Sequence, residues 1–169
     1  FLKKGNLVCG YSIIEIIVYL AIFTAISILV INSFLVILSS FNKTNMNRKL
    51  LESGSVAMER ISRDIRHASS VDIVNSTLGT DPGILQLNMA SGGYMKFKKE
   101  TNGALYLYNN SSTGNNLLGQ HVSLTNLVFR RIATTESEAI KIEMTLQYSD
   151  GNNIKSENFY NTIVLRGGY

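Results

Sequence analysis

Proline, cysteine, histidine and tryptophan are nearly absent from this chain of 169 residues, which has one proline, one cysteine, two histidines and no tryptophan. A single cysteine, Cys9, cannot form an internal disulfide, so the fold must be stabilised by packing. His67 and His121 have no second histidine or cysteine at metal-ligand spacing, and we interpret both as ordinary residues. Phosphate-binding loops and nucleophile motifs are also missing. The residues therefore predict neither an enzyme nor a cofactor.

The charge of the chain is too small for a nucleic-acid-binding protein. The formal net charge is +4, and two of the basic residues, Lys3 and Lys4, lie in the first ten positions. Further along, Arg60, Arg63 and Arg66 are interleaved with acidic residues, which favours a solvated face over a basic contact surface. We expect no nucleic-acid partner.

The acidic residues of the second half are scattered. A calcium site among them is conceivable, but their spacing matches no ligand motif, and we expect no bound metal. The residues in question are Asp72, Asp81, Glu136, Glu138 and Asp150.

The dominant feature of the sequence is an apolar run from Ile13 to Leu38, which contains no proline or glycine. As a helix these 26 residues would be roughly 39 Å long, enough to cross a hydrocarbon core of about 30 Å. The run predicts a transmembrane helix. Its polar members are Glu15, Tyr19, Thr24, Ser27, Asn32 and Ser33.

Glu15 is the unusual member, because a carboxylate at membrane depth costs about 2.5 to 3.5 kcal/mol on insertion scales. One interpretation is that Glu15 lies so near the helix start that it snorkels into the headgroups and interacts with the helix dipole. The other is that it has a charged partner inside the membrane.

The residues around this glutamate resemble the N-terminus of type IV prepilins and the related pseudopilins. Lys3 and Lys4 are followed by Gly10 and then by Y-S-I-I-E-I-I-V-Y-L-A-I-F. In that family a prepilin peptidase cleaves after the glycine, here before Tyr11, and methylates the new N-terminal amine. Tyr11 departs from the commoner phenylalanine but remains aromatic. Y-L-A-I-F, without a helix-kinking proline, looks most like minor pseudopilins of the J type or similar minor pilins.

The resemblance also implies a role for Glu15, which falls on the family's glutamate four residues after the new terminus. Its carboxylate is expected to pair with the N-terminal amine of a neighbouring subunit as the helices bundle into a filament. Such a partner would remove the cost of an unpaired charge. Residues 1–10 would then be a leader peptide and residues 11–38 the transmembrane helix.

Residues 39–70 predict an amphipathic continuation of this helix, with some looseness near residues 40–47. An apolar stripe recurs at spacings of three and four residues. The opposite face carries Glu59 with Arg63 and Arg60 with Asp64, pairs at the i,i+4 spacing that supports an exposed helix. The stripe consists of Leu50, Gly54, Ala57, Ile61, Ile65 and Ala68.

Residues 71–169 change to the alternating pattern of strands. Asp81-Pro82-Gly83, Asn102-Gly103 and Asp150-Gly151 are typical of turns. The expected fold is α+β, a long helix packed on one antiparallel sheet of about five or six strands, the last paired with its predecessor. The expected strands are Ile84–Met89, Tyr94–Lys98, Ala104–Tyr108, Val122–Ile132, Ile140–Ser149 and Phe159–Leu165.

Two functions fit these observations. The resemblance implies a minor pilin or pseudopilin of a type IV pilus, a competence pseudopilus or a type II secretion pseudopilus, which would initiate the filament or belong to its tip complex. Its partners would be the prepilin peptidase, other pilin subunits and membrane lipid. It would cross the bacterial cytoplasmic membrane once, with its C-terminal domain outside the cytoplasm. The alternative is a single-span membrane-anchored binding module whose leader is never cut, held by Lys3 and Lys4 on the cytoplasmic side.

Overall fold

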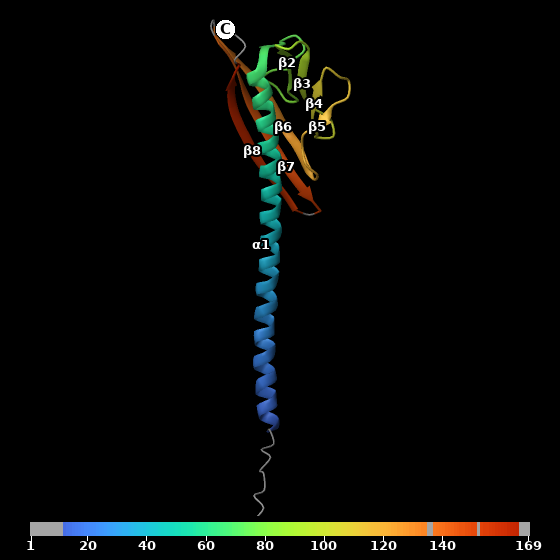
Figure 1. Cartoon of the computed structure of the whole chain (residues 1–169). Coiled ribbons are helices and arrows are strands. Elements are labelled where there is room, and N and C mark those ends of the chain that lie inside the picture. Colours follow the sequence, from blue (N-terminus) through green and yellow to red (C-terminus); the bar gives the residue numbers. More distant parts are fainter. Residues whose placement is uncertain (1–11, 135–136, 152, 166–169) are drawn as a thin grey trace, which may run out of the picture. The chain divides into compact units, whose positions relative to one another are not determined.

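The computed structural model describes residues 12–134, 137–151 and 153–165. The chain divides into two compact units, residues 1–44 and 45–169. Helix α1 (Ile13–His67) contributes to both units, and strands β1 to β8 belong to the second (Figure 1). The predicted α+β fold is confirmed: a long N-terminal helix is followed by antiparallel sheets.

The first unit is helical because nothing within it interrupts the backbone hydrogen bonds. Proline and glycine, the two residues least favourable in a helix interior, are absent between Ile13 and Thr44. The looseness that we expected near residues 40–47 is not seen. α1 is continuous there, and the Thr44 hydroxyl donates to the carbonyl oxygen of Ser40 at 3.0 Å. Such a bond gives the hydroxyl a partner within the helix itself.

In the second unit, α1 is amphipathic as the spacing predicts. The five stripe residues that lie in the helix are all buried, and so is Ala68, immediately after the helix end. Leu50, Ile61 and Ile65 have no exposed surface at all. The helix ends at His67, within two residues of the expected end at Ser69.

The opposite face of this half-helix differs from the prediction at Asp64. We expected Asp64 to be exposed, but it is only 5% exposed. The predicted pair with Arg60 is confirmed, because the Arg60 Nε atom donates to Asp64 Oδ2 at 2.8 Å. That bond satisfies the carboxylate beside the stripe and makes its burial tolerable. Among the described residues no ion pair joins Glu59 to Arg63; instead Arg63 Nε lies 3.9 Å from Asp64 Oδ1.

The strands form two antiparallel sheets rather than the single sheet that we expected. One has five strands in the order β1-β2-β3-β4-β5, and the other has three in the order β6-β7-β8. The last strand pairs with its predecessor, as predicted. The strands are β1 (Ala68–Val71), β2 (Ile84–Met89), β3 (Tyr94–Lys99), β4 (Leu105–Asn109), β5 (Asn115–Asn116), β6 (Val122–Ala133), β7 (Glu138–Asp150) and β8 (Asn153–Val164).

The sequence does not predict two of these strands. β1 follows the helix directly, and its four residues are too few to show an alternating pattern. β5 consists of two exposed asparagines and is a strand only because it pairs with β4. Both lie at the edges of the five-stranded sheet, where pairing with a neighbour decides the conformation.

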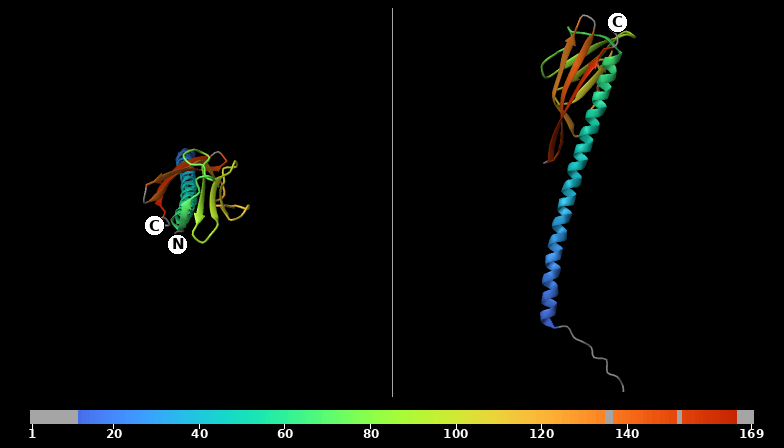
Figure 2. Two further views of the ribbon diagram at one scale, coloured as in Figure 1. Left: turned by 90° about the horizontal axis from the view of Figure 1, so that it is seen from above. Right: turned by 90° about the vertical axis from the view of Figure 1, so that its left-hand side faces the viewer.

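One hydrophobic core lies between the two sheets and the C-terminal half of α1 (Figure 2). Strand β7 places Ile140, Ile142 and Met144 in it, with no more than 1% of their surface exposed. Phe97 of β3 and Phe129 of β6 are the largest fully buried side chains. Residues 141, 143, 145 and 147, on the other face of β7, are half-buried rather than fully exposed.

A close approach between α1 and β8 explains the glycine in the helical stripe. A Cβ atom at Gly54 would lie 2.1 to 2.6 Å from three ring atoms of Phe159. Phe159 packs against the core at this point. Gly54 is unfavourable for a helix interior but allows the ring to lie directly on the helix backbone.

We expect Gly54→Ala to lower the free energy of unfolding by about 1 kcal/mol. The helix gains roughly 1 kcal/mol from alanine, but displacing the Phe159 ring costs about 1 to 3 kcal/mol. In a Phe159→Ala background the same change should stabilise instead. The free energy of unfolding is measured by denaturant titration in detergent, monitored by circular dichroism. The four proteins compared are the original chain, Gly54→Ala, Phe159→Ala and the double variant. An equal effect of Gly54→Ala in both backgrounds would contradict the packing explanation.

Candidate functional site

Glu15 lies in the first turn of α1. The Ser12 carbonyl oxygen accepts hydrogen bonds from the backbone N–H groups of Glu15 and Ile16, at 3.0 and 3.3 Å, and these bonds begin the helix. A carboxylate at this position interacts favourably with the positive end of the helix dipole. It also lies at the start of the apolar run rather than in its middle.

Tyr19 is the side-chain partner of Glu15 in the described structure. Its hydroxyl donates to Glu15 Oε1 at 3.0 Å, one helical turn away. Glu15 is therefore only partly exposed, whereas its helical neighbours are exposed. We did not predict this contact, although the i,i+4 spacing of the two residues was a signal for it. The phenol provides one hydrogen bond but no positive charge, so the carboxylate remains without an ionic partner in the described residues.

The described surface of α1 that follows Glu15 is mostly apolar. The large hydrophobic residues from Ile13 to Leu38 are between 46% and 79% exposed. A soluble helix would bury such a surface against another part of the protein. None of the most apolar part of α1 is buried, and the helix is long and apolar enough that it could span a membrane.

Two small polar residues of this run satisfy their hydroxyls locally. Thr24 Oγ1 donates to the Ala21 carbonyl oxygen at 2.9 Å, and Ser27 Oγ donates to the Phe23 carbonyl oxygen at 2.8 Å. Such bonds let hydroxyl residues enter lipid at little cost. Glu15 is thus the one ionisable carboxylate in the described apolar segment, and it is the group that needs a partner.

The other predicted site residues at this end of the chain are Gly10 and Tyr11. Both lie outside the described residues. The proposed cleavage and methylation at this bond remain predictions.

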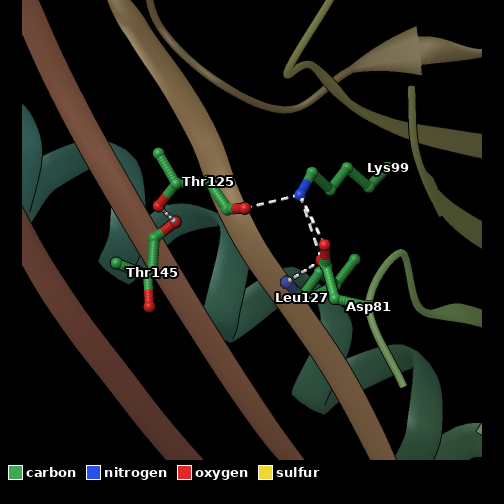
Figure 3. A network of polar contacts seen from close by, with 5 residues as sticks. All are labelled: Asp81, Lys99, Thr125, Leu127 and Thr145. Carbon is green, nitrogen blue, oxygen red and sulfur yellow. Dashed lines mark hydrogen bonds and ion pairs between the residues drawn. The ribbon is translucent and has the colours of Figure 1, made fainter. Parts of the chain in front are cut away.

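A second polar cluster joins the two sheets, and no pattern in the sequence predicted it. Lys99 Nζ lies 3.0 Å from both carboxylate oxygens of Asp81 and 2.5 Å from the Thr125 carbonyl oxygen (Figure 3). The backbone N–H of Leu127 donates to Asp81 Oδ1 at 2.7 Å, and Thr125 Oγ1 donates to the Thr145 carbonyl oxygen at 3.1 Å. Thr125 lies at a β-bulge in β6, which turns its carbonyl toward Lys99.

This cluster has a structural role, because it connects the two sheets. The Lys99 ammonium has three protons and three acceptor oxygens around it. Its side chain is only 15% exposed and that of Asp81 is 32% exposed. We therefore assign both side chains to holding β3 and the turn before β2 against β6.

The acidic residues considered for calcium either make hydrogen bonds and ion pairs within the protein or lie apart from one another. Asp72 accepts hydrogen bonds from the N–H groups of Val74 and Asn75, both at 3.1 Å, and from the Asn75 and Gln86 side chains at 2.7 and 2.9 Å. Glu138 pairs with Arg131. Among the described residues no group of three metal-ligating side chains comes together; Glu136 lies outside them.

Hydrogen bonding shifts the protonation of these surface carboxyls. The bonds from Asn75, first from its side chain and then from its backbone, hold the pKa of Asp72 below its ordinary value. Hydrogen bonds from Lys141 and then Arg130 do the same to the pKa of Glu143 on the outer face of β7. These are shifts expected of structural ion pairs and capped turns.

A third group links β3 and β4. Lys98 Nζ lies 2.9 Å from Glu100 Oε1, and the Tyr108 hydroxyl donates to the same oxygen at 2.9 Å. The hydrogen bond from Lys98, followed by that from Tyr108, lowers the pKa of Glu100. The bonds to Glu100 in turn raise the pKa values of Lys98 and Tyr108.

The two histidines are exposed. His67 ends α1, and the ring of His121 lies 6.0 Å from that of Tyr148. His121 adopts a positive φ of 63° immediately before β6, a conformation in which histidine is more frequent than most residues. Its backbone carbonyl accepts the N–H of Ser149 at 2.9 Å, which anchors the start of β6 to β7.

Comparison with known proteins gives no match to a family model, to a curated protein or to a solved structure.

The turn around Asp72 generates a pH prediction. Its pKa is lowered in the folded state, so its contribution to stability is present above the unfolded value of 3.8 and is lost as the pH falls through the folded value. Asp72→Asn should therefore lower the denaturant midpoint at about pH 6, and the gap to the original chain should narrow at about pH 3. Urea titrations of the full chain at both pH values measure this. A gap that is independent of pH would show that the charge of Asp72 plays no part.

Proposed function

We propose that this protein is a minor pilin or pseudopilin, a structural subunit that enters a type IV pilus, a competence pseudopilus or a type II secretion pseudopilus. The observation that carries the proposal is Glu15. It is an ionisable carboxylate within an exposed apolar helix, and its described side-chain partner is the uncharged Tyr19. A carboxylate in this setting is best explained by a charged partner supplied from another molecule.

The N-terminal sequence supplies such a partner. Cleavage after Gly10 would create an amine at Tyr11, four residues before Glu15, in every copy of this chain. In a bundle of parallel helices, displaced along their axes, the amine of one subunit can approach the glutamate of the next. The pair would set the register between subunits, while the apolar side chains fill the interior of the filament.

The Tyr19 hydroxyl gives Glu15 an interim partner before assembly. A hydrogen bond to a charged group contributes about 1.5 to 3 kcal/mol, which offsets part of the insertion cost of the carboxylate. The neutral phenol donates a hydrogen bond to one oxygen of the Glu15 carboxylate. It does not neutralise the carboxylate, which can still pair with a cation. In this function the helix anchors the subunit in the cytoplasmic membrane, and the sheets contact other subunits outside the cytoplasm.

The first test is the N-terminal peptide of the protein isolated from its native membrane. We expect a terminus at Tyr11 that is heavier by one methyl group, and we expect an uncut precursor when Gly10 is replaced by valine. Mass spectrometry of the N-terminal peptide measures both. An intact leader in the original protein would instead favour the membrane-anchored binding module, in which Lys3 and Lys4 stay in the cytoplasm.

The second test addresses Glu15. Glu15→Ala should be inserted and processed normally, but its content in sheared filaments should fall at least about tenfold, because the neighbouring amine is left unpaired. Thr24→Ala is the matched control, since it removes a polar group from the same helix without removing charge. Immunoblots of membrane and filament fractions give the comparison. Equal incorporation of both variants would show that Glu15 has no role in assembly and would favour the interpretation that it snorkels into the headgroups.

A further inference from the structure

The two edges of the three-stranded sheet differ in whether their backbone groups are hydrogen-bonded. At one edge, β6 is closed by groups from the other sheet and its turns, which occupy N–H and carbonyl groups from Leu124 to Phe129. A covered edge cannot pair with another chain. The bonds are Leu124 N–H to Gly103 O at 2.7 Å, Lys99 Nζ to Thr125 O at 2.5 Å, Leu127 N–H to Asp81 Oδ1 at 2.7 Å, Gly83 N–H to Leu127 O at 2.8 Å and Gly79 N–H to Phe129 O at 2.8 Å.

At the other edge, β8 pairs with β7 and with no further strand among the described residues (Figure 1). Successive backbone N–H groups of a strand point to opposite sides. Leu165 donates to the Glu138 carbonyl, so the odd-numbered residues of β8 face β7. The even-numbered residues, from Ile154 to Val164, therefore direct their N–H and carbonyl groups to the free edge.

Only a single one of these free-edge groups is capped within the described chain. The N–H of Thr162 donates to the side-chain oxygen of Asn161 at 2.9 Å, while the side-chain nitrogen of Asn161 donates to Ser62 Oγ at 3.1 Å. Asn161 thus braces β8 on α1. The backbone N–H and carbonyl groups of Asn158 and Tyr160 have no partner in the described residues, although the Asn158 side-chain oxygen accepts a hydrogen bond from Thr145 Oγ1 at 2.8 Å.

A groove of about 570 Å³ runs beside this edge, and we name it the β8 groove. Helix residues from Ser55 to His67 line one side of it, and Phe159 and Asn161 line the other. These two β8 residues are on the core-facing side of the sheet, because they pair with buried residues of β7. A fourth strand beside β8 would cover the groove and place every second side chain in it.

The charges that line the β8 groove favour an acidic occupant. Two arginines, Arg63 and Arg66, line it, against a single acid, Glu59. Arg66 has no ion pair in the described structure, and Arg63 has only a 3.9 Å approach to Asp64. Basic residues at a helix C-terminus already complement its dipole. Arg63 and Arg66 also line a groove next to the unpaired backbone groups of β8. Compensation of the helix dipole alone would not require them to lie there.

We propose that the free edge of β8 binds an extended acidic segment of another polypeptide, which adds a fourth strand to the β6-β7-β8 sheet and places a carboxylate against Arg63 and Arg66. Backbone hydrogen bonds to Asn158 and Tyr160 would provide affinity, and the β8 groove would provide specificity. This inference goes beyond the proposed function, because it does not depend on cleavage at Gly10 or on the role of Glu15.

Amide hydrogen exchange tests the edge directly. The full chain is pulse-labelled in its native membrane and, separately, after purification in detergent, and exchange is resolved by residue through mass spectrometry. We expect the N–H groups of Asn158 and Tyr160 to exchange at least about tenfold more slowly in the membrane. The N–H groups of Phe159 and Asn161, which face β7, are the internal control and should be protected in both samples. Equal exchange of Asn158 and Tyr160 in the two samples would overturn the proposal.

The partner and its charge are tested by crosslinking. Benzoylphenylalanine in place of Tyr160, irradiated in native membranes, should crosslink to an extended peptide that contains aspartate or glutamate, identified by sequencing the product. Arg66→Glu should reduce this product about tenfold, Arg66→Lys should largely restore it, and Lys96→Glu, the same charge change on the other sheet, should leave it unchanged. Crosslinking to a second copy of this chain, or equal loss in the Lys96→Glu protein, would refute the acidic partner.

The Gly10 and edge experiments fail separately. A cut and methylated terminus with fast exchange at Tyr160 would leave the proposed function standing and remove the β8 site. An uncut leader with slow exchange at Tyr160 would remove the proposed function and leave the β8 site standing.

Discussion

The second unit depends on the burial of one stripe of α1. From Leu50 to Ile65 the helix presents a narrow apolar stripe to both sheets, and the sheets meet the same core. Burying a leucine or isoleucine completely stabilises a fold by about 1.5 to 3 kcal/mol. With no disulfide available in the described unit, this packing and the contacts around it have to stabilise the fold. Gly54 belongs to the same constraint, because only a residue without Cβ allows Phe159 of β8 to lie on the helix.

The two sheets need a second kind of interaction, since apolar packing alone does not fix where they meet. Lys99 and Asp81 provide it together with the bulge at Thr125. A partly buried ion pair that also bonds to backbone groups is directional, so it specifies one arrangement of β3 relative to β6. The same bonds cover two backbone groups at the edge of β6, and bonds with Gly103, Gly83 and Gly79 cover others between Leu124 and Phe129. The Lys99–Asp81 cluster therefore orients the sheets and also contributes to closing this edge of the three-stranded sheet.

These two kinds of interaction explain what the sequence could predict. Burial is encoded in local periodicity, so the helical stripe and the alternation of β7 were found from Leu50, Ile61, Ile140 and Ile142. Turns such as Asn102-Gly103 are encoded by backbone preferences of the residues themselves. The division into two sheets was missed because it depends on contacts between residues far apart in sequence. Asp81 and Lys99 show no pattern that pairs them, and Asp64 was misplaced because its bond to Arg60 lets a carboxylate lie beside the core.

The two candidate sites raise the same physical question in different environments. Glu15 is a carboxylate in an apolar segment whose described side-chain partner is a neutral hydroxyl, and β8 carries backbone donors and acceptors that face no other strand in the described residues. Water satisfies an exposed strand edge, so the β8 edge is compatible with a free subunit and available to a partner. If the apolar helix lies in a membrane, as we propose, water is less available to Glu15, and the cost of a charge there would persist until a cation approaches. In the two proposed roles the carboxylate would therefore be the stronger driving force for association, whereas the strand edge, with its directional bonds and basic groove, would be better suited to selecting the partner.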